Sequence, residues 1–442
     1  MSDMNILIEN CRVLPMTAAP GEDPGYFHGA VGVSAGRIVF ASAQESDVRD
    51  FERCYGTDIR RIDARGMFLL PGLVNLHNHA AMTLMRGYAD DMALMPWLEE
   101  KIWPFEGLLD GEDVYWGARL GIAEMLLGGT TTFVDMYWHA DRVAEAAFRS
   151  GIRAVVCPAF VDGRYEEFER TFESLAGRYV SADGRIGVRI GPHAPYTCSP
   201  RTIESALELC GKYGVGVHVH LSETRSEIDI VRQRYGVTPV EYLRDLGMFG
   251  FPTLAAHCVH VGDADMEIMQ RYGVAVGHNP QSNMKLASGV APVAEMLRRG
   301  MSVGIGTDGP SSNNDLDMWE EMRTASLLQK SATGDPRALP AYETLYMATA
   351  GGAQVLGMED RIGAVAPGLR ADLILVDPKG PHLRPCYDPA AALVYGGKAS
   401  DVRTVIVDGC VLVEDGKLCR EDLDETIRAA EERIERIFGR MR

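Results

Sequence analysis

Eight short apolar segments, separated by amphipathic stretches, constrain the fold of this chain more than any other feature. The segments lie at residues 68–74, 131–136, 154–160, 188–192, 215–220, 254–257, 274–277 and 302–307. Strands that are apolar along their whole length are typical of parallel sheets that helices cover on both faces. Eight such strands, each followed by a helix, predict an α/β fold of the closed (β/α)8 TIM-type barrel.

An open, doubly wound parallel sheet is the alternative for the same alternation. That fold requires a glycine-rich, phosphate-binding turn after its first strand. Here the first apolar segment leads instead into His77-Asn78-His79. The sequence therefore favours the barrel.

The two ends of the chain have a different character from its middle. Residues 1–66 contain short strand-like pieces and a hairpin that turns at Ala35-Gly36, and residues 365–442 contain a second hairpin that turns at Asp408-Gly409. A charged amphipathic helix follows over residues 421–440. We expect residues 1–66 and 365–442 to join as one small β-sandwich, with the barrel of residues 67–364 inserted between them.

Composition limits the partners of this chain. Its formal net charge of -18 argues against nucleic acid and against an anionic membrane surface. The nine cysteines are scattered without a CxxC pair, so we expect reduced thiols in a cytoplasmic protein. No signal peptide and no apolar run of about 20 residues is visible. A small-molecule partner is therefore expected, with neither nucleic acid nor membrane.

Histidines gather at the ends of the predicted strands, where a barrel places its functional groups. Of the 11 histidines, eight lie at or just beyond such ends: His77, His79, His193, His218, His220, His257, His260 and His278. Asp308 follows the last strand. Any one of these histidines could be an ordinary core residue, but their coincidence at several strand ends indicates a metal site.

The residue types also indicate how many metal ions to expect. Three neutral imidazoles and one carboxylate can bind a single zinc ion and leave a position open for water. His77, His79, His220 and Asp308 are the expected ligands, and the first two face the same way because a strand alternates its faces. A bridged pair of metals would need an anionic bridge at the end of the fourth strand, where His193 stands with no lysine nearby. We expect one divalent metal, Zn²⁺ with Fe²⁺ or Mn²⁺ as alternatives.

Two further residues are candidates for proton transfer. Glu223 lies three residues beyond His220, so its carboxyl group can reach a substrate without binding the metal, as a general acid or base must. A solvated loop glutamate is the alternative interpretation. His257 is expected to act as a base or to orient the attacking group, and His260 to lie further out.

Several segments together resemble the amidohydrolase superfamily. They are PGLVNLHNHAAMTLMRGYADD, HAPYT, HVHLSET, AHCVH, HNPQSNMKLASG and GTDGPSSNNDLDMWEEMR. Within it the chain is similar to the methylthioadenosine/S-adenosylhomocysteine deaminase group, related to guanine-type deaminases and triazine hydrolases. The resemblance implies a zinc-dependent aminohydrolase that converts a 5′-modified adenosine to its inosine analogue and ammonia. It also implies a homo-oligomer, a dimer or tetramer.

The resemblance assigns roles to residues at the matching positions. His77, His79, His220 and Asp308 match the metal ligands, and Asp308 also accepts a proton. Glu223 matches the group that protonates the ring nitrogen, and His257 the group that orients the attacking hydroxide.

The same resemblance implies residues that bind the substrate. Glu106 matches a carboxylate that binds the ribose hydroxyls, and Trp97 belongs to the same loop. His193 matches a contact on the ribose side. Arg164 matches a basic residue for the amino-acid end of S-adenosylhomocysteine, although the stretch before it is shorter than in the family. The alternatives are a core position for Trp97, a helix-surface charge for Glu106 and a solvated cation for Arg164.

Two other functions remain open at this point. A guanine- or oxopurine-type base deaminase, or a triazine hydrolase, would use the same chemistry without a ribose. A catalytically inactive barrel kept for binding or assembly would be expected to lack metal ligands, whereas here every ligand position is filled.

Overall fold

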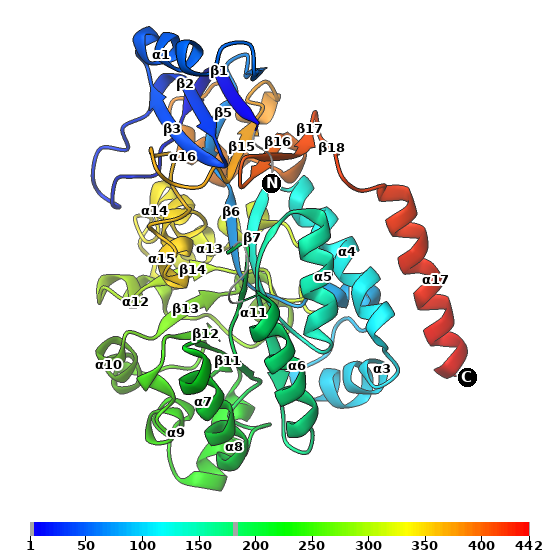
Figure 1. The fold of residues 1–442 in the computed structure, drawn as a ribbon. Coiled ribbons are helices and arrows are strands. Elements are labelled where there is room, and N and C mark those ends of the chain that lie inside the picture. The colour runs from blue at the N-terminus through cyan, green and yellow to red at the C-terminus, as the bar shows by residue number, and fades with distance from the viewer. Residues whose placement is uncertain (1–3, 180–183, 442) are drawn as a thin grey trace.

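The computed structural model describes residues 4–179 and 184–441. A β unit lies at the top of Figure 1, and a parallel barrel surrounded by helices lies below it. Among the described helices, none combines the length and the apolar character that crossing a membrane requires.

Both ends of the chain build the β unit, as the sequence predicted. Its sheet has the strand order β18-β17-β16-β15-β5-β1-β2-β3, with β4 paired to β1. Its two halves meet where β5 and β15 pair antiparallel, with Leu373 opposite Pro71. The strands are β1 (Asn5–Val13), β2 (Phe27–Ser34), β3 (Arg37–Ser42), β4 (Ile59–Asp63), β5 (Phe68–Pro71), β15 (Leu373–Val376), β16 (Val402–Val407), β17 (Cys410–Glu414) and β18 (Lys417–Leu418).

The barrel strands pair in parallel, in the order of the sequence. They are β6 (Leu73–Asn78), β7 (Thr130–Tyr137), β8 (Arg153–Phe160), β9 (Ile186–Val188), β10 (Gly191–Pro192), β11 (Val217–Leu221), β12 (Thr253–His257), β13 (Ala275–His278) and β14 (Val303–Ile305). A parallel bridge between Ile190 and Val217 joins the strands β6–β10 to the strands β11–β14. On the other side, the backbone N–H of Asp308 donates to the carbonyl of His77 at 2.9 Å. This contact brings the end of β14 to β6, which excludes the open-sheet alternative.

Helices cover the outside of the barrel and fill the connections. They are α1 (Glu45–Tyr55), η1 (Ala80–Met85), α2 (Leu94–Trp97), η2 (Leu98–Ile102), α3 (Trp103–Glu106), α4 (Gly111–Leu127), α5 (Ala140–Ser150), α6 (Tyr165–Tyr179), α7 (Pro200–Tyr213), α8 (Arg225–Tyr235), α9 (Pro239–Asp245), η3 (Met248–Gly250), α10 (Asp263–Tyr272), α11 (Pro280–Lys285), α12 (Val293–Arg298), α13 (Met318–Thr333), α14 (Ala341–Met347), α15 (Ala350–Leu356), η4 (Pro381–Leu383), α16 (Pro389–Gly396), η5 (Ala399–Asp401) and α17 (Leu423–Met441). The final helix, α17, matches the amphipathic helix expected at the end of the chain.

Two of the apolar segments are each two strands rather than one. The segment 68–74 divides at Gly72 into β5, which belongs to the β unit, and β6, which belongs to the barrel. A side chain at Gly72 would meet Thr131 at 2.1 Å, so this close crossing of the two parts requires glycine. The segment 188–192 contains the end of β9 and the whole of β10, and both of these strands pair with β8 in the barrel. The division of the chain at 66/67 and 364/365 stays a prediction.

A buried ion pair fastens the barrel to the β unit. Arg153 in β8 donates from Nε and Nη2 to the two carboxylate oxygens of Asp372, at 2.7 and 3.0 Å. Both side chains are 2% exposed. Asp372 also accepts from the backbone N–H of Asp408 at 2.8 Å. The pair therefore connects the middle of the chain with the hairpin near its end.

Candidate metal centre and active-site cleft

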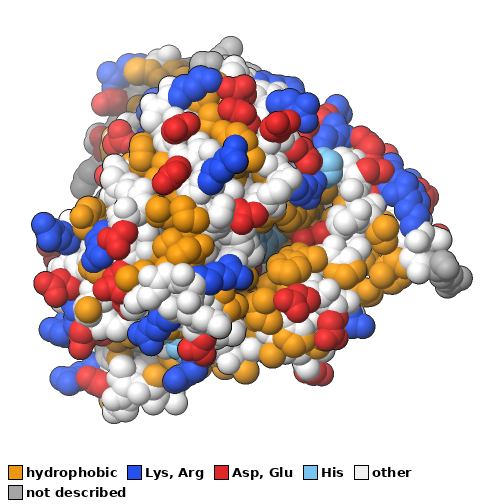
Figure 2. Space-filling model, turned by 90° about the horizontal axis from the view of Figure 1, so that it is seen from below, with side chains coloured by type: hydrophobic (Ala, Val, Ile, Leu, Met, Phe, Trp, Pro, Cys, Tyr) orange, Lys and Arg blue, Asp and Glu red, His pale blue; other side chains and the backbone are white. Residues whose placement is uncertain are grey.

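The predicted ligands come together at the carboxyl ends of the barrel strands, on the side away from the β unit. His77 lies in β6 and His220 in β11. His79 directly follows β6, and Asp308 is the third residue after β14. Figure 2 views this face and shows a hollow with hydrophobic side chains gathered beside it. The imidazoles of His77, His79 and His220 offer nitrogen atoms within 4.8 Å of one another.

Hydrogen bonds fix the tautomers of His79 and His220. Nδ1 of His79 donates to the carbonyl of Met136 at 2.5 Å, and Nδ1 of His220 donates to the carbonyl of His193 at 2.8 Å. In a neutral imidazole with Nδ1 protonated, Nε2 carries a lone pair. The two Nε2 atoms face each other at 3.4 Å. A cation at this point, either a metal ion or a proton on one of the rings, would relieve the repulsion between two lone pairs at this distance.

A chain of two histidines fixes the third ligand. Nδ1 of His218 donates to the carbonyl of Leu254 at 3.0 Å, which leaves its Nε2 free to accept from Nδ1 of His77 at 2.8 Å. Nε2 of His77 therefore also carries a lone pair. This atom is buried and has no hydrogen-bond partner among the residues that the structure describes. Such outer partners commonly orient histidine ligands of metals.

Asp308 completes the cluster with a carboxylate. Its Oδ1 lies 3.3 Å from Nε2 of His77 and 3.2 Å from Nε2 of His79. Its Oδ2 accepts from the hydroxyls of Ser282 and Ser312 at 2.6 and 2.8 Å. Asp308 has a φ of 60°, in the left-handed region. The residue holds a sparsely populated backbone conformation that turns its carboxylate toward the imidazoles.

The electrostatics of the cluster suit a cation. Burial lowers the pKa of His77 to about 3 and that of His220 well below its usual value, so both imidazoles are neutral. Burial alone would raise the pKa of Asp308, but the contacts with His77 and His79 hold it well below its usual value. Burial opposes the charging of His79 too, yet Asp308 outweighs it and raises its pKa to about 9. The position beside His79 and Asp308 therefore takes positive charge, and the donor set fits one divalent metal.

Two predicted proton-transfer groups lie beside this cluster. Nδ1 of His257 donates to the side-chain oxygen of Asn283 at 2.9 Å, so its Nε2 is directed toward Glu223, 3.9 Å away. Glu223 is 4% exposed, and burial raises the pKa of its carboxyl group. His260 lies further out, as expected, and its Nε2 donates to the carbonyl of Ser288 at 2.7 Å.

A second glutamate, which the sequence interpretation missed, holds the loop of Glu223. Glu227, in the first turn of α8, is 1% exposed and accepts from the backbone N–H groups of Ser222 and Glu223 at 2.9 and 2.8 Å. Ser222 has a φ of 52°. The two hydrogen bonds stabilise this left-handed turn and fix the start of the Glu223 side chain.

An inner cleft extends from the four candidate metal ligands to the segment that follows β6. Its lining includes the ligands His79, His220 and Asp308 and the proton-transfer candidates Glu223 and His257. Trp97, Glu106 and His193 line the same cleft. Burial raises the pKa of the Glu106 carboxyl group, which lies against Tyr137 and Trp138. Trp97 is 4% exposed and donates from its indole to the carbonyl of Ala89 at 3.0 Å, so it is both a core residue and part of the wall.

Arg164 lies in an outer part of the cleft, away from the candidate metal ligands. It borders a space that shares Glu106, Trp138 and His193 with the inner cleft. Its guanidinium donates to both carboxylate oxygens of Glu167 and lies 5.0 Å from the centre of the Trp138 ring. The structure thus places Trp97, Glu106 and His193 together and leaves Arg164 at the rim. Nδ1 of His193 lies 2.9 Å from the hydroxyl of Thr197.

The sequence interpretation also missed Asp135, which lies near the end of β7. Its Oδ2 accepts from the backbone N–H of Ala80 at 2.6 Å, directly after His79. Burial raises its pKa to about 6. The sequence held a signal for it, because Asp135 is the one charged residue in the apolar segment 131–136 and lies next to its end.

A parallel barrel that gathers histidines and an aspartate at its strand ends has the architecture of a metal-dependent hydrolase. The model of the amidohydrolase family matches residues 68–412, and the chain belongs to this family. The predicted resemblance is therefore confirmed.

Individual relatives are similar over almost their entire length. A 5-methylthioadenosine/S-adenosylhomocysteine deaminase from Desulforudis audaxviator is 50% identical over 439 residues, covering 98% of this chain and 99% of the relative. The crystal structure of an adenosine deaminase from Xanthomonas campestris, with bound zinc, has a TM-score of 0.92 and 35% identity, covering 99% of both chains. An atrazine chlorohydrolase from Arthrobacter aurescens, complexed with zinc, has a TM-score of 0.86 and 26% identity, covering 97% of this chain and 100% of the other.

Proposed function

We propose that this chain is a zinc-dependent hydrolytic deaminase of 5′-modified adenosines. One observation carries the proposal: the cleft that is lined by the candidate metal ligands and by Glu223 is also lined by Glu106. A purine amino group can thus lie at the metal while a ribose reaches Glu106. The names of the relatives from Desulforudis audaxviator and Xanthomonas campestris support the same substrate class.

The chemistry starts from the cluster of four ligands. His77, His79, His220 and Asp308 would hold the metal. When bound, a divalent metal supplies Lewis-acid chemistry and lowers the pKa of a water ligand toward about 7. Asp308 accepts the proton that the attacking water gives up. The lone pair on Nε2 of His257 accepts a hydrogen bond from the same water and aims it at the ring carbon that bears the amino group.

Protonation of the ring belongs to Glu223. Because burial raises its pKa, its carboxyl group is protonated more readily than an exposed glutamate and can donate to the ring nitrogen next to the attacked carbon. Charge then does not accumulate on the ring as the carbon–oxygen bond forms. The proton that Asp308 accepted passes to the amino group, so that the carbon–nitrogen bond breaks and ammonia leaves. The proton of the new hydroxyl group passes to Glu223 as the carbonyl of the inosine analogue forms, which restores the carboxyl group.

Glu106 selects nucleosides over free bases in this proposal. Its carboxylate accepts hydrogen bonds from the two ribose hydroxyls, and a buried acceptor of this kind discriminates strongly against a substrate that lacks them. His193 and Trp97 shape the ribose side of the cleft. Arg164, at the rim of the cleft, binds the far end of the 5′ substituent.

The test is a screen of the zinc-loaded enzyme for ammonia release from adenosine, 5′-deoxyadenosine, 5′-methylthioadenosine, S-adenosylhomocysteine and guanine, and for chloride release from a chlorotriazine. We expect the highest kcat/KM for a 5′-modified adenosine. Glu106→Gln should lower this kcat/KM by about a hundredfold, since hydrogen bonds to a charged group contribute about 1.5–3 kcal/mol. Turnover of guanine or the triazine alone, insensitive to Glu106→Gln, would instead establish the base deaminase or triazine hydrolase.

The location of the enzyme belongs to the same proposal. Cys54 and Cys419 are exposed thiols, and thiols of this kind persist in a reducing cytoplasm. A homo-oligomer, dimer or tetramer, stays a prediction.

A further inference from the structure

The helical segment that carries Glu106 has little conformational stability of its own. Between η1 and α4 its helical part is α2 (Leu94–Trp97), the π-helical turn η2 (Leu98–Ile102) and α3 (Trp103–Glu106), which follow one another without a break as one helix of 13 residues. A helix of about this length is only marginally stable by itself, and the π turn interrupts its regular hydrogen bonding. The position of Glu106, the last residue of α3, therefore depends on what packs against the segment.

An aromatic contact from the C-terminal helix α17 reaches the residue just before Glu106. Phe105 is fully buried. Its ring centre lies 5.1 Å from that of Tyr88 and 6.1 Å from that of Phe438, and the Tyr88 and Phe438 rings are 5.9 Å apart. These three rings form one cluster, so Phe438 of α17 supports α3 from the side opposite the cleft.

Polar contacts from α17 reach the residues just after Glu106. Nη1 of Arg440 donates to the carbonyl of Leu108 at 3.1 Å. Arg436 donates to Asp110 at 2.7 Å and also to Asp113, which is fully buried. Asp110 is the N-cap of α4, so these bonds fix the point where the segment ends. The contacts of α17 thus lie on both sides of Glu106.

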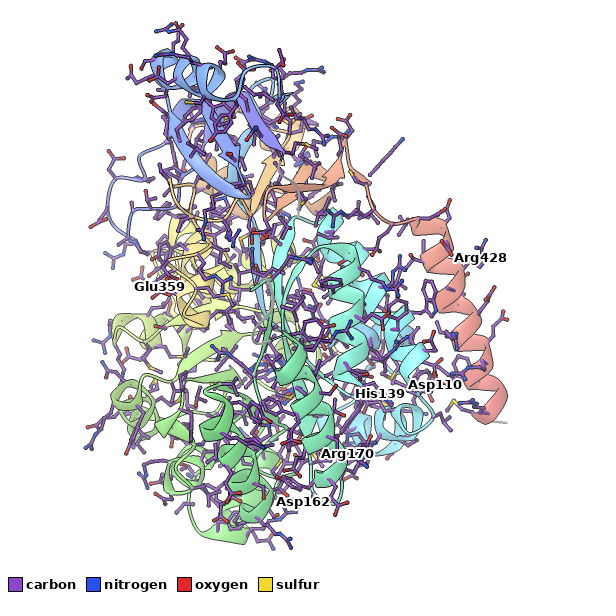
Figure 3. All side chains as sticks on the ribbon, in the orientation of Figure 1. Asp110, His139, Asp162, Arg170, Glu359 and Arg428 are labelled. Carbon is purple, nitrogen blue, oxygen red and sulfur yellow. The ribbon has the colours of Figure 1, made fainter. Side chains whose placement is uncertain are left out.

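The helix itself is firmly attached to the barrel. Thr426, Ala430 and Ile437 are buried along one face of α17. Figure 1 shows α17 running down the right side of the barrel beside α4 and α3. In Figure 3, Asp110 lies on the side of the barrel that faces α17, whereas Arg428 points away. A 19-residue helix anchored in this way is a rigid support for a segment that has little rigidity of its own.

We propose that α17 is a positioning helix for substrate binding, in which Phe438, Arg436 and Arg440 hold α3 so that the carboxylate of Glu106 faces the cleft. These three are positioning residues, because none of them lines the inner cleft. The nucleoside side of this inference rests on the proposed function, whereas the mechanical link between α17 and α3 does not.

The mechanical link is tested by hydrogen exchange of the zinc-loaded enzyme. Phe438→Ala and Arg440→Ala should each speed backbone exchange in residues 103–110 and leave exchange of β6 and β11 unchanged. Arg428→Ala is the matched control, since it alters the exposed face of the same helix. If Phe438→Ala does not fold, Arg440→Ala carries the test alone. Unchanged exchange in residues 103–110 would overturn the inference, whatever the substrate of the enzyme.

Kinetics with 5′-methylthioadenosine test the consequence for binding. Phe438→Ala should raise KM by about tenfold with kcat within about twofold, because only binding that is uniform along the reaction is lost. When Glu106→Gln is already present, Phe438→Ala should raise KM by less than about a further twofold, since Phe438 influences binding through Glu106. Full additivity in the double variant would overturn the inference. If Glu106→Gln alone changes nothing, the proposed function fails, and the exchange result still decides the role of α17.

Discussion

The buried pair of Arg153 and Asp372 supports a quantitative prediction about stability. Arg153→Met keeps most of the side-chain volume but removes both charged hydrogen bonds, at 2.7 and 3.0 Å, to a carboxylate that is 2% exposed. Asp372 would still accept from the backbone N–H of Asp408. Breaking a buried ion pair by removing one partner costs about 3–5 kcal/mol, because it leaves an uncompensated buried charge. We expect a loss in this range.

The assay is urea unfolding at pH 7, followed by tryptophan fluorescence with the zinc content held constant. Arg149→Met is the control, because its ion pair with Glu145 lies at the surface, and pairs of this kind contribute about 0–1 kcal/mol. Adding Asp372→Asn to Arg153→Met removes the stranded charge and should restore at least about 1 kcal/mol. A loss below about 1 kcal/mol for Arg153→Met, or no recovery in the double variant, would refute the reasoning.

Three further predictions concern the active site. Glu227→Ala should lower kcat by about tenfold or more with unchanged zinc content, because the turn that carries Glu223 loses two hydrogen bonds; an unaltered kcat would show that the turn holds itself. His218→Phe should weaken zinc binding by about 10–100-fold in a chelator competition, since it frees the tautomer of His77; equal affinity would contradict the histidine chain. Removing the metal with a chelator should end ammonia release and lower the urea midpoint, and zinc should restore both; a chelator-resistant activity would rule out the metal chemistry.

The sequence predicted the parts of the site that follow from strand periodicity. His77, His220 and Asp308 stand at the ends of apolar strands, and a parallel barrel brings such ends to one face whatever the loops do. The loop residue Glu223 was found because it follows His220 at a short offset. The roles of all these residues in catalysis stay predictions until the variants are measured.

Other features of the fold and of the site could not be predicted from the sequence, for physical reasons. The π-helical turn at Leu98–Ile102 breaks the 3.6-residue period of the helix over residues 94–106, so the form of the segment before Glu106 could not be predicted. The roles of Glu227 and His218 depend on hydrogen bonds to a backbone N–H or to a second histidine, which leave no trace in residue spacing. The division at Gly72 was missed because two successive strands of different sheets read as one apolar run.

The pairing of β5 with β15 has a consequence for how this chain folds. Leu373 and Pro71 are neighbours in the sheet but lie roughly three hundred residues apart in the sequence, so joining them early would close a very large loop at an entropic cost with few contacts in return. Formation of the barrel brings the two segments together first, because Gly72 alone separates β5 from the barrel strand β6. We therefore expect the barrel to form before the sheet closes, so that the two halves of the β unit pair only after the residues between them are in place.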